Sequence, residues 1–388
     1  MKKIIILGST GSIGKQTLEI LKKDKKKFKV ILLSTDKNIS LILKQIKSFK
    51  VKNIVVTNKK KYQILKKKLK KINVFPDFEN IEKKINKADY TMSAISGIEG
   101  LRPTIKIIKK TRRIAIANKE SIICGWGLIQ KELKKYKTEF IPVDSEHFSI
   151  WSVIKNYPKS NIEKIILTAS GGPFLNKKIK KNISPKEAVN HPNWKMGKKI
   201  SIDSATLMNK IFEIIEAKRI FDVELNKFDI LIHPKSYIHA IVKFKNGLIK
   251  IIAHETNMKI PISNSIYMGD KNQKFIKTKK IDLNILNSLN LQQVNIKKFP
   301  VIKIIKKISK KNSLFDTILV SINDELVNLF LKNKINFFDI SSKIWFLINS
   351  RFFSKFIHQK PKNLAQIEKL NEFVRLKTRS LSVISQKK

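Results

Sequence analysis

Cysteine and long apolar runs are nearly absent from this chain of 388 residues. A single cysteine, Cys124, cannot form a disulfide within the chain or supply a metal site made of several cysteines. Only four apolar residues separate Met1-Lys2-Lys3 from a glycine-rich turn, too few for the core of a signal peptide, and no stretch approaches the length of a membrane span. We therefore expect a soluble, cytoplasmic protein with no membrane partner.

Acidic residues and arginine are both scarce beside lysine. The chain carries 81 Lys and Arg against 30 Asp and Glu, a formal net charge of +51, and only seven of the basic residues are Arg. Nucleic acid is the first partner that such a charge suggests. The lysines are spread from end to end among Ile and Asn, however, and specific phosphate recognition favours Arg. We attribute the charge to compositional drift and expect no specific nucleic-acid partner.

A glycine-rich turn follows the first apolar run. Residues 4–7 lead into Gly8-Ser9-Thr10-Gly11-Ser12-Ile13-Gly14, and a helical pattern comes next. Glycines allow the backbone to approach a pyrophosphate, which the amides at the helix start then bind. The spacing G-x-x-G-x-x-G is a variant of the dinucleotide fingerprint, so this turn alone is weak support for a cofactor.

Several later apolar runs end in the same way. Strands are predicted at 28–34, 53–57, 88–95, 113–117 and 140–143, most of them followed by polar or glycine residues. Ligands bind at the carboxyl ends of strands in a doubly wound α/β sheet, so the repetition predicts a Rossmann-type domain. After the second strand come both Asp36 and Lys37, suited to a ribose hydroxyl and to a 2′-phosphate respectively, which leaves the form of the cofactor open.

The last of these strands ends in Asp144-Ser145-Glu146. Side chains two apart on an extended backbone point to the same side, so Asp144 and Glu146 could hold one hard divalent cation while Ser145 faces elsewhere. A solvated turn after an edge strand has the same pattern. The pair by itself does not decide between the two interpretations.

The pattern changes from about residue 150, where a second sheet is predicted. Its first strand, 164–168, opens into a turn of small residues, and the loop 191–197 contains a Trp that is either a lid or an anchor for its own loop. Residues 203–217 predict an amphipathic helix. That helix places Lys210 and Glu213 on one face, where a surface ion pair is the usual interpretation.

Six motifs, taken in order, resemble the 1-deoxy-D-xylulose 5-phosphate reductoisomerase family over roughly the first 250 residues. They are Gly8 to Gly14, Ala117-Asn118-Lys119-Glu120-Ser121, Pro142-Val143-Asp144-Ser145-Glu146-His147, Ser170-Gly171-Gly172-Pro173-Phe174, His191-Pro192-Asn193-Trp194-Lys195-Met196-Gly197, and Asp203-Ser204-Ala205-Thr206 with Asn209-Lys210. The resemblance implies conversion of 1-deoxy-D-xylulose 5-phosphate to 2-C-methyl-D-erythritol 4-phosphate in non-mevalonate isoprenoid biosynthesis. It also implies NADPH, one divalent cation (Mg²⁺, Mn²⁺ or Co²⁺), a skeletal rearrangement before hydride reduction, and a homodimer.

The roles of individual residues come from the resemblance alone. The metal ligands would be Asp144, Glu146 and Glu213, and with Lys119 they form the catalytic set. The substrate-binding residues would be Lys119, Ser145, Glu146, Ser170, His191, Trp194, Ser204, Asn209, Lys210 and Glu213. Of these, Ser170, Ser204, Asn209 and Lys210 would hold the phosphate, and His191 and Trp194 would close a lid. The NADPH-binding residues would be Thr10, Gly11, Ser12, Ile13, Lys37, Asn38, Asn118, Glu120 and Gly197.

We expect an α/β protein in four parts. These are an NADPH-binding Rossmann-like domain (1–149), a catalytic, metal-binding and dimerisation α+β domain (150–273), a linker (274–295) and a C-terminal helical bundle (296–388). Asp36 stands where the family usually has Gly, which leaves the strength of the NADPH preference open. Two alternatives are another Rossmann NAD(P)-dependent dehydrogenase, which would need no acidic trio, and a basic nucleic-acid-binding protein, which would not explain the ordered motifs.

Overall fold

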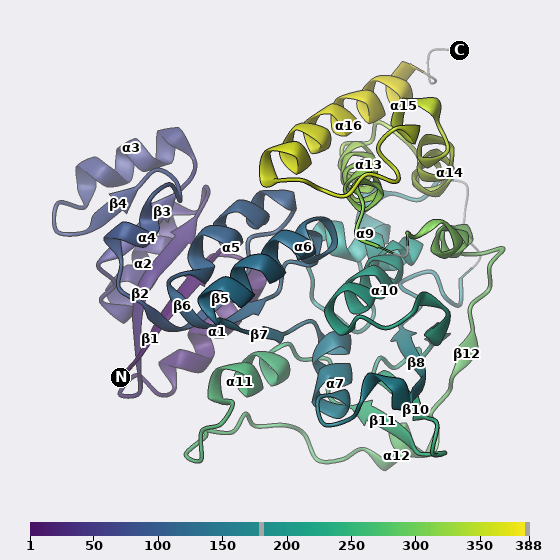
Figure 1. The fold of residues 1–388 in the computed structure, drawn as a ribbon, viewed down its shortest axis with the longest axis horizontal. Helices are drawn as coiled ribbons and strands as arrows, with labels where there is room; N and C mark the ends of the chain where they lie inside the picture. The colour runs from purple at the N-terminus through teal and green to yellow at the C-terminus, as the bar shows by residue number, and fades with distance from the viewer. Residues whose placement is uncertain (178–181, 310, 385–388) are drawn as a thin grey trace. The chain divides into compact units, whose positions relative to one another are not determined.

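The computed structural model describes residues 1–177, 182–309 and 311–384. The chain forms two compact units (Figure 1). The first unit contains Met1–Ile122, Gly127–Phe148 and Met258–Lys277, and the second contains Ile123–Trp126, Ser149–Asn257 and the chain from Thr278 onward.

The first unit is built on a seven-stranded sheet in which all neighbouring strands are parallel. The strands are β1 (Lys2–Leu7), β2 (Phe28–Thr35), β3 (Asn53–Val56), β4 (Asn73–Phe75), β5 (Ala88–Ser93), β6 (Thr111–Ile116) and β7 (Glu139–Pro142). Their order, β4-β3-β2-β1-β5-β6-β7, places the change of winding direction at β1. This doubly wound sheet confirms the predicted Rossmann-type fold, and β4 is a short strand that the sequence reasoning missed.

The first unit also contains helices, most of which connect these strands. They are α1 (Ser12–Lys22), α2 (Ile39–Phe49), α3 (Lys59–Lys68), α4 (Ile81–Lys84), η1 (Ile98–Gly100), α5 (Leu101–Ile108), α6 (Lys119–Tyr136) and α11 (Lys259–Tyr267). The helix α11 packs against α1, and the Tyr90 hydroxyl lies 2.7 Å from the Ser265 hydroxyl. A segment that is remote in sequence therefore completes the core of this unit.

The second unit contains a five-stranded sheet in the order β11-β10-β8-β9-β12. Its strands are β8 (Ile162–Ala169), β9 (Phe228–Ile232), β10 (Ile238–Phe244), β11 (Ile249–Ala253) and β12 (Gln292–Gln293). The pair β8 and β9 is parallel, and the other pairs are antiparallel. The predicted second sheet is therefore present, with β11 at one edge.

Helices make up the rest of the second unit. They are η2 (Lys159–Asn161), α8 (Pro185–Ala188), α9 (Lys198–Thr206), α10 (Met208–Phe221), η3 (Leu225–Lys227), α12 (Leu283–Asn287), η4 (Pro300–Lys307), α13 (Leu314–Leu331), α14 (Phe337–Ile348), α15 (Arg351–Ser354) and α16 (Leu364–Ile384), while α7 (Ser145–Ile154) begins in the first unit. Figure 1 shows α13, α14 and α16 gathered into a bundle, in which α13 is almost wholly buried. The predicted C-terminal helical bundle is confirmed.

The single amphipathic helix predicted over 203–217 is wrong in two respects. The helix breaks at Leu207, whose φ of 64° lies in the left-handed region, so α9 ends and α10 begins there. In addition, α10 is buried on nearly every face, its polar residues included. Its alternation of polar and apolar residues indicates buried polar contacts and not a solvated face.

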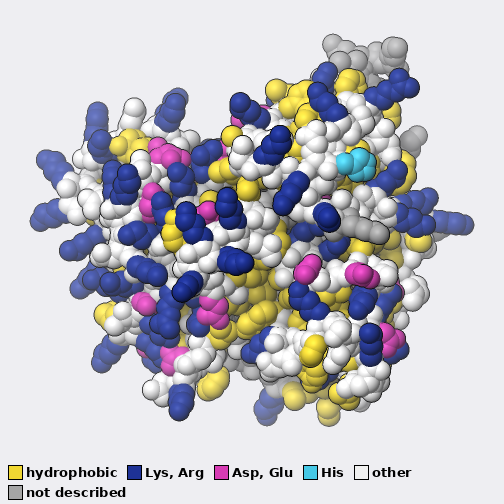
Figure 2. Space-filling view, in the orientation of Figure 1, with side chains coloured by type: hydrophobic (Ala, Val, Ile, Leu, Met, Phe, Trp, Pro, Cys, Tyr) yellow, Lys and Arg dark blue, Asp and Glu magenta, His cyan; other side chains and the backbone are white. Residues whose placement is uncertain are grey.

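No helix in the described part of the chain is both long enough and apolar enough to span a membrane. Figure 2 shows Lys and Arg side chains scattered over the visible face, without a single basic patch. This dispersion agrees with the interpretation of the charge as compositional.

Candidate functional site

The turn between β1 and α1 can be made only with glycine at two positions. Gly8 has a φ of +77°, and a Cβ there would lie 2.6 Å from the Ala94 carbonyl oxygen. A Cβ on Gly14 would lie 2.4 Å from the Gly8 carbonyl oxygen. The predicted residues Thr10 to Ile13 occupy this turn and the first residues of α1, and all of them are at least partly exposed. The start of α1 is therefore accessible to an anionic ligand.

Polar residues follow β2 and β6 as predicted. Asn38 caps α2, its side-chain oxygen accepting a hydrogen bond from the amide of Leu41 at 3.1 Å. The Lys37 ammonium is 3.7 Å from a carboxylate oxygen of Asp36, and both side chains are exposed. Because Asp36 also accepts a hydrogen bond from Thr57 at 3.1 Å, a negative charge is fixed beside Lys37.

Asn118 joins the carboxyl ends of two neighbouring strands. Its side chain accepts a hydrogen bond from the Ser121 amide, which caps α6, and donates to the carbonyl oxygens of Gly97, at 2.7 Å, and of Ile95. Lys119 and Glu120 form the first turn of α6 and are buried. These three predicted residues thus lie at the edge of the sheet where Rossmann domains bind ligands.

The backbone around Asp144 is not extended, which corrects the sequence interpretation. The strand β7 ends at Pro142 and α7 begins at Ser145, so Glu146 lies in the first turn of a helix. The carbonyl oxygen of Asp144 accepts a hydrogen bond from the Phe148 amide at 2.8 Å, as at a helix start. Carboxylate oxygens of Asp144 and Glu146 still lie within 4.8 Å of each other. The Ser145 hydroxyl does not face away from this pair, because it donates to Glu146.

Asp144 is held in its ionised form. Its carboxylate oxygens lie 3.2 Å from the Lys119 ammonium and 3.6 Å from Nδ1 of His147. Burial by itself raises the pKa of a carboxyl group, but Lys119 and then His147 hold the pKa of Asp144 well below its ordinary value. The group is therefore a largely buried carboxylate, 15% exposed, that could bind a cation in place of the ammonium.

The second unit contains a similar buried pair in the first turns of α10. The Glu213 carboxylate accepts a hydrogen bond from the Asn209 amide on one oxygen and contacts the Lys210 ammonium through the other. The side chains of Lys210 and Glu213 are only 4% and 2% exposed. The usual interpretation of this spacing as a surface ion pair is therefore wrong for this chain.

Ser170 and His191 form a hydrogen-bonded pair whose protons can be assigned. Nδ1 of His191 accepts from the backbone amides of Asn193, at 3.1 Å, and Trp194, at 3.0 Å, so the proton of the neutral ring is on Nε2. Nε2 then donates to the Ser170 hydroxyl oxygen at 2.9 Å, and that oxygen also accepts from the Gly172 amide at 3.0 Å. With both contacts donating to it, the Ser170 hydroxyl keeps its own proton to donate to a ligand.

The neutral state of His191 predicts a pH dependence of stability. Burial lowers the pKa of His191 from 6.5 to about 4, so the folded protein resists the protonation that the unfolded chain accepts. The stabilisation is complete above pH 6.5 and is lost as the pH falls toward 4. Urea unfolding at pH 7.5 and pH 5 should therefore give a smaller difference in His191→Asn than in the native protein. An equal difference would contradict the assignment, and His358→Asn, at an exposed position, is the control.

The loop 191–197 is anchored in its first half, and Asn193, for which the sequence analysis proposed no role, makes the anchoring hydrogen bonds. The side-chain amide of Asn193 donates hydrogen bonds to the Pro234 carbonyl oxygen, at 2.6 Å, and to the Ser236 hydroxyl, at 2.8 Å. Trp194 is half-buried and packs edge to face on His239, with ring centroids 6.1 Å apart. Gly197 is exposed and precedes α9. The loop is thus neither a free lid nor a wholly buried anchor.

The turn that contains Ser170 lies against the end of α9. Gly172 has a φ of +68°, and a Cβ there would lie 2.9 Å from the Ser204 carbonyl oxygen. The predicted residues Ser170, His191 and Ser204 are thereby brought to one region of the second unit. Asp203 lies nearby and accepts a hydrogen bond from the Asn323 side chain at 2.8 Å, a buried polar contact between α9 and α13. The Lys199 ammonium, on α9 itself, is 3.3 Å from the Asp203 carboxylate. No local sequence pattern predicts the contact between the two helices.

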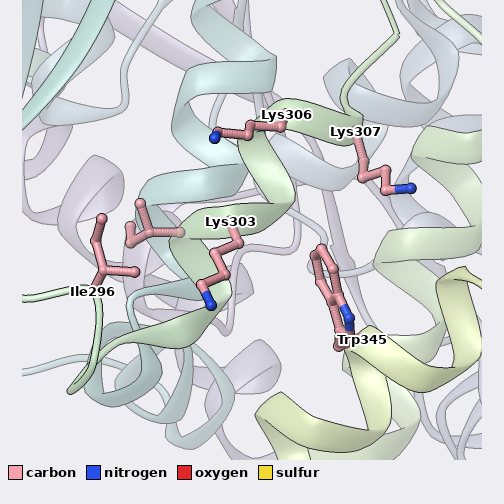
Figure 3. A pocket seen from close by; sticks show the side chains of 6 residues that line it. Ile296, Lys303, Lys306, Lys307 and Trp345 are labelled. Atoms are coloured by element: carbon pink, nitrogen blue, oxygen red, sulfur yellow. The ribbon is translucent and has the colours of Figure 1, made fainter.

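A separate hollow of about 340 Å³ lies among the C-terminal helices (Figure 3). Its lining consists of Ile296, Ile302, Lys303, Lys306, Lys307 and Trp345. Figure 3 shows Lys303 lying between Ile296 and Trp345. None of the predicted site residues lines this hollow, so it is not part of the candidate site.

Models of known protein domains match three successive parts of the chain. Residues 4–126 match the model described as 1-deoxy-D-xylulose 5-phosphate reductoisomerase. Residues 140–221 match the C-terminal domain of 1-deoxy-D-xylulose 5-phosphate reductoisomerase, and residues 254–377 match a DXP reductoisomerase C-terminal domain.

Whole proteins give the same result. The chain is 57% identical over 390 residues to the 1-deoxy-D-xylulose 5-phosphate reductoisomerase of Pelagibacter ubique (strain HTCC1062), with 99% of this chain and 100% of the relative covered. It is 29% identical to a crystal structure of DOX-P reductoisomerase in complex with NADPH, fosmidomycin and magnesium, with a TM-score of 0.92 and 100% of both chains covered. A Zymomonas mobilis reductoisomerase in complex with NADPH is also 29% identical, with a TM-score of 0.87 and coverage of 98% of this chain and 99% of the other.

Proposed function

This chain belongs to the 1-deoxy-D-xylulose 5-phosphate reductoisomerase family, and from that premise we propose how its residues divide the work of the reaction. The protein is a metal-dependent, NADPH-dependent oxidoreductase that converts 1-deoxy-D-xylulose 5-phosphate to 2-C-methyl-D-erythritol 4-phosphate in isoprenoid biosynthesis. The observation that carries the proposal for the site is the presence of two carboxylate–ammonium pairs, one largely buried in the first unit and one fully buried in the second.

We assign the divalent cation to Asp144, Glu146 and Glu213. All the donors are carboxylate oxygens, which suit a hard ion such as Mg²⁺ or Mn²⁺ better than a soft one. The proximity of the Asp144 and Glu146 oxygens and the ionised state of Asp144 support the assignment. When bound, the cation supplies Lewis-acid polarisation of the sugar's carbonyl and stabilises negative charge on oxygen.

Lys119 and Lys210 occupy carboxylates that the cation would need, so both lysines must change partners when the cation and the substrate bind. In the structure Lys119 neutralises Asp144, and Lys210 neutralises Glu213. We propose that Lys210 turns to the substrate phosphate and Lys119 to the reacting end of the sugar when the cation and the substrate arrive. Both carboxylates would then share the bound cation, Lys210 would pair with the phosphate dianion, and Lys119 would face the sugar oxygen on which negative charge develops.

The phosphate would be held by Ser170, Ser204, Asn209 and Lys210. The proton assignment at Ser170 supports this role, because its hydroxyl has a donor left for a phosphate oxygen. Ser145 and Glu146 would contact the sugar beside Lys119. His191 and Trp194 would cover the substrate and exclude water while hydride is transferred.

NADPH would bind along the carboxyl edge of the first sheet. The residues assigned to it are Thr10, Gly11, Ser12, Ile13, Lys37, Asn38, Asn118, Glu120 and Gly197. At Gly8 and Gly14 the backbone passes too close to neighbouring backbone atoms for any side chain. The turn built in this way leaves the start of α1 accessible for a pyrophosphate, which supports this position. NADPH supplies the hydride when it is bound.

The reaction can be tested by following NADPH oxidation after addition of 1-deoxy-D-xylulose 5-phosphate and Mn²⁺. Oxidation should stop when a chelator is added, and 2-C-methyl-D-erythritol 4-phosphate should be the product. Turnover of a simple hydroxy acid in the presence of the chelator would instead favour an ordinary Rossmann dehydrogenase.

We propose a homodimer that forms through the edge strand β11. Natural edge strands are usually protected by charges or by a covering element. Here Ile249 and Ile251 are 58% and 49% exposed on that edge, next to the exposed Leu248. A second copy of the chain would remove these side chains from water.

Ile251→Lys is expected to convert the dimer to a monomer, because it places a charge in the middle of the proposed contact. Analytical ultracentrifugation would then give half the native mass. Ile64→Lys, at another exposed isoleucine on α3, should leave the native mass unchanged. A native protein that sediments as a monomer, or an Ile251→Lys protein that remains a dimer, would contradict the proposed contact.

We retain two further proposals from the sequence. The four-part division at 149, 273 and 295 describes functional parts, with NADPH binding in the first and catalysis in the second. A cytoplasmic location is supported by the lone buried Cys124, which leaves the chain without an internal disulfide, and cell fractionation tests it.

A further inference from the structure

Two histidines stack beside the loop that carries Trp194. The rings of His239 and His254 are nearly parallel, at 21°, with centroids 3.7 Å apart. Trp194 packs edge to face on His239 at 6.1 Å. The three rings form a continuous row in the second unit, which runs from the loop through β10 to the residue after β11.

The backbone explains why His239 is available for this row. The ladder between β10 and β11 pairs Ile238 with Ala253 and Ala240 with Ile252, so its register shifts at His239. A residue at such a bulge is turned out of the regular alternation, and bulges commonly aim side chains at functional sites. Nε2 of His239 is 3.1 Å from the His254 carbonyl oxygen, which holds one edge of the ring. The face of the ring is held separately, by packing on the ring of His254.

His254 is itself held in place. Its backbone amide donates to the Tyr237 carbonyl oxygen at 3.0 Å, and its Nδ1 is 2.7 Å from the carbonyl oxygen of Glu255. A ring that donates from Nδ1 to a carbonyl is rigid about its side-chain torsions. Burial also lowers the pKa of His254, so the ring stays neutral near pH 7 and can stack on a neighbour without a charge of its own.

We propose that His254 is a positioning residue: it fixes the ring of His239, on which Trp194 rests, and so sets where the loop closes over the sugar phosphate. The inference rests on the proposed function, in which Trp194 covers the substrate. Without the ring of His254, His239 gains rotational freedom and Trp194 loses a fixed surface. The cost falls on substrate binding and not on the chemical step, because none of the three rings belongs to the catalytic set.

Kinetics of the holoenzyme with 1-deoxy-D-xylulose 5-phosphate, NADPH and Mn²⁺ test this role. His254→Leu keeps the bulk and removes the aromatic face, so KM for the sugar phosphate should rise about fivefold, as expected for loss of an aromatic pair. The kcat and the KM for NADPH should stay within about twofold of the native values. His254→Phe restores a stacking ring and should restore KM. His358→Ala, at an exposed histidine, is the control.

The outcomes separate this inference from the proposed function. Trp194→Ala should raise KM for the sugar phosphate. If it does so while His254→Leu leaves KM unchanged, the positioning role is overturned. The same holds if His254→Phe and His254→Leu give the same KM. If Trp194→Ala leaves KM unchanged, the proposed role of the loop fails. The indole N–H resonance of Trp194, assigned with Trp194→Phe, then decides the positioning role. It should shift in His254→Leu and stay in place in His358→Ala, and an unshifted resonance overturns the inference.

Discussion

Asp144→Asn is expected to lower kcat/KM by about 10³-fold or more while leaving the fold intact, because charge stabilisation in the transition state depends on the carboxylate. Asn has the same shape as Asp but carries no charge, so the cation loses the negative charge of one of its three proposed ligands. The ammonium of Lys119, 3.2 Å away, loses this negative charge beside it at the same time. Circular dichroism should match the native protein, and calorimetric titration with Mn²⁺ should show much weaker binding.

Asp222→Asn provides the matched control. Asp222 also contacts a lysine, Lys159 at 3.1 Å, but its side chain is 86% exposed. Exposed ion pairs contribute little, so this variant should keep native activity and native Mn²⁺ binding. Full activity of Asp144→Asn in the presence of a chelator would contradict the assignment of Asp144 as a metal ligand.

Lys210→Met is expected to affect both stability and substrate binding. Removing one partner of a buried ion pair typically costs about 3–5 kcal/mol, because the remaining charge stays in a low-dielectric site. KM for the sugar phosphate should also rise about 10²-fold, as expected when one partner of a buried, charge-assisted contact is truncated. Urea unfolding and steady-state kinetics measure the two effects.

Competition between the cation and the Lys210 ammonium for Glu213 leads to a second prediction for this variant. In the native protein a cation must compete with the Lys210 ammonium for Glu213, whereas in Lys210→Met it does not. Mn²⁺ should therefore raise the unfolding temperature of the variant by more than that of the native protein. Lys243→Met is the control, because Lys243 pairs with Glu163 at 2.6 Å with both side chains nearly half exposed. Equal Mn²⁺ shifts in all three proteins would contradict the proposed role of Lys210.

The sequence was sufficient for most strands of the first sheet because their signals are local. Each parallel strand is a short apolar run, and the polar residues that follow it lie together at one edge as a consequence of parallel pairing. The start of α7 was also within reach. Asp144 followed by Ser145 and Glu146 is a helix-start pattern, since acids are favoured in the first turn, but the preceding apolar run led to an extended interpretation.

Burial and long-range contacts could not be predicted in the same way. A spacing of three residues between Lys210 and Glu213 is identical in a surface pair and in a buried one, and only the packing around α10 distinguishes them. The return of α11 to the first unit and the stacking of His254 on His239 both join segments that local patterns treat as independent. The left-handed Leu207 that divides the predicted helix has no sequence signature either.

The central claim is that Asp144, Glu146 and Glu213 together bind one divalent cation. Crystals grown with Mn²⁺ and the sugar phosphate, measured at the manganese absorption edge, test it most directly. The account predicts one strong anomalous peak within about 2.0–2.3 Å of an oxygen from each of the three carboxylates, the range for hard divalent ions. A peak bound by other residues, or one from which Glu213 is absent, would contradict it.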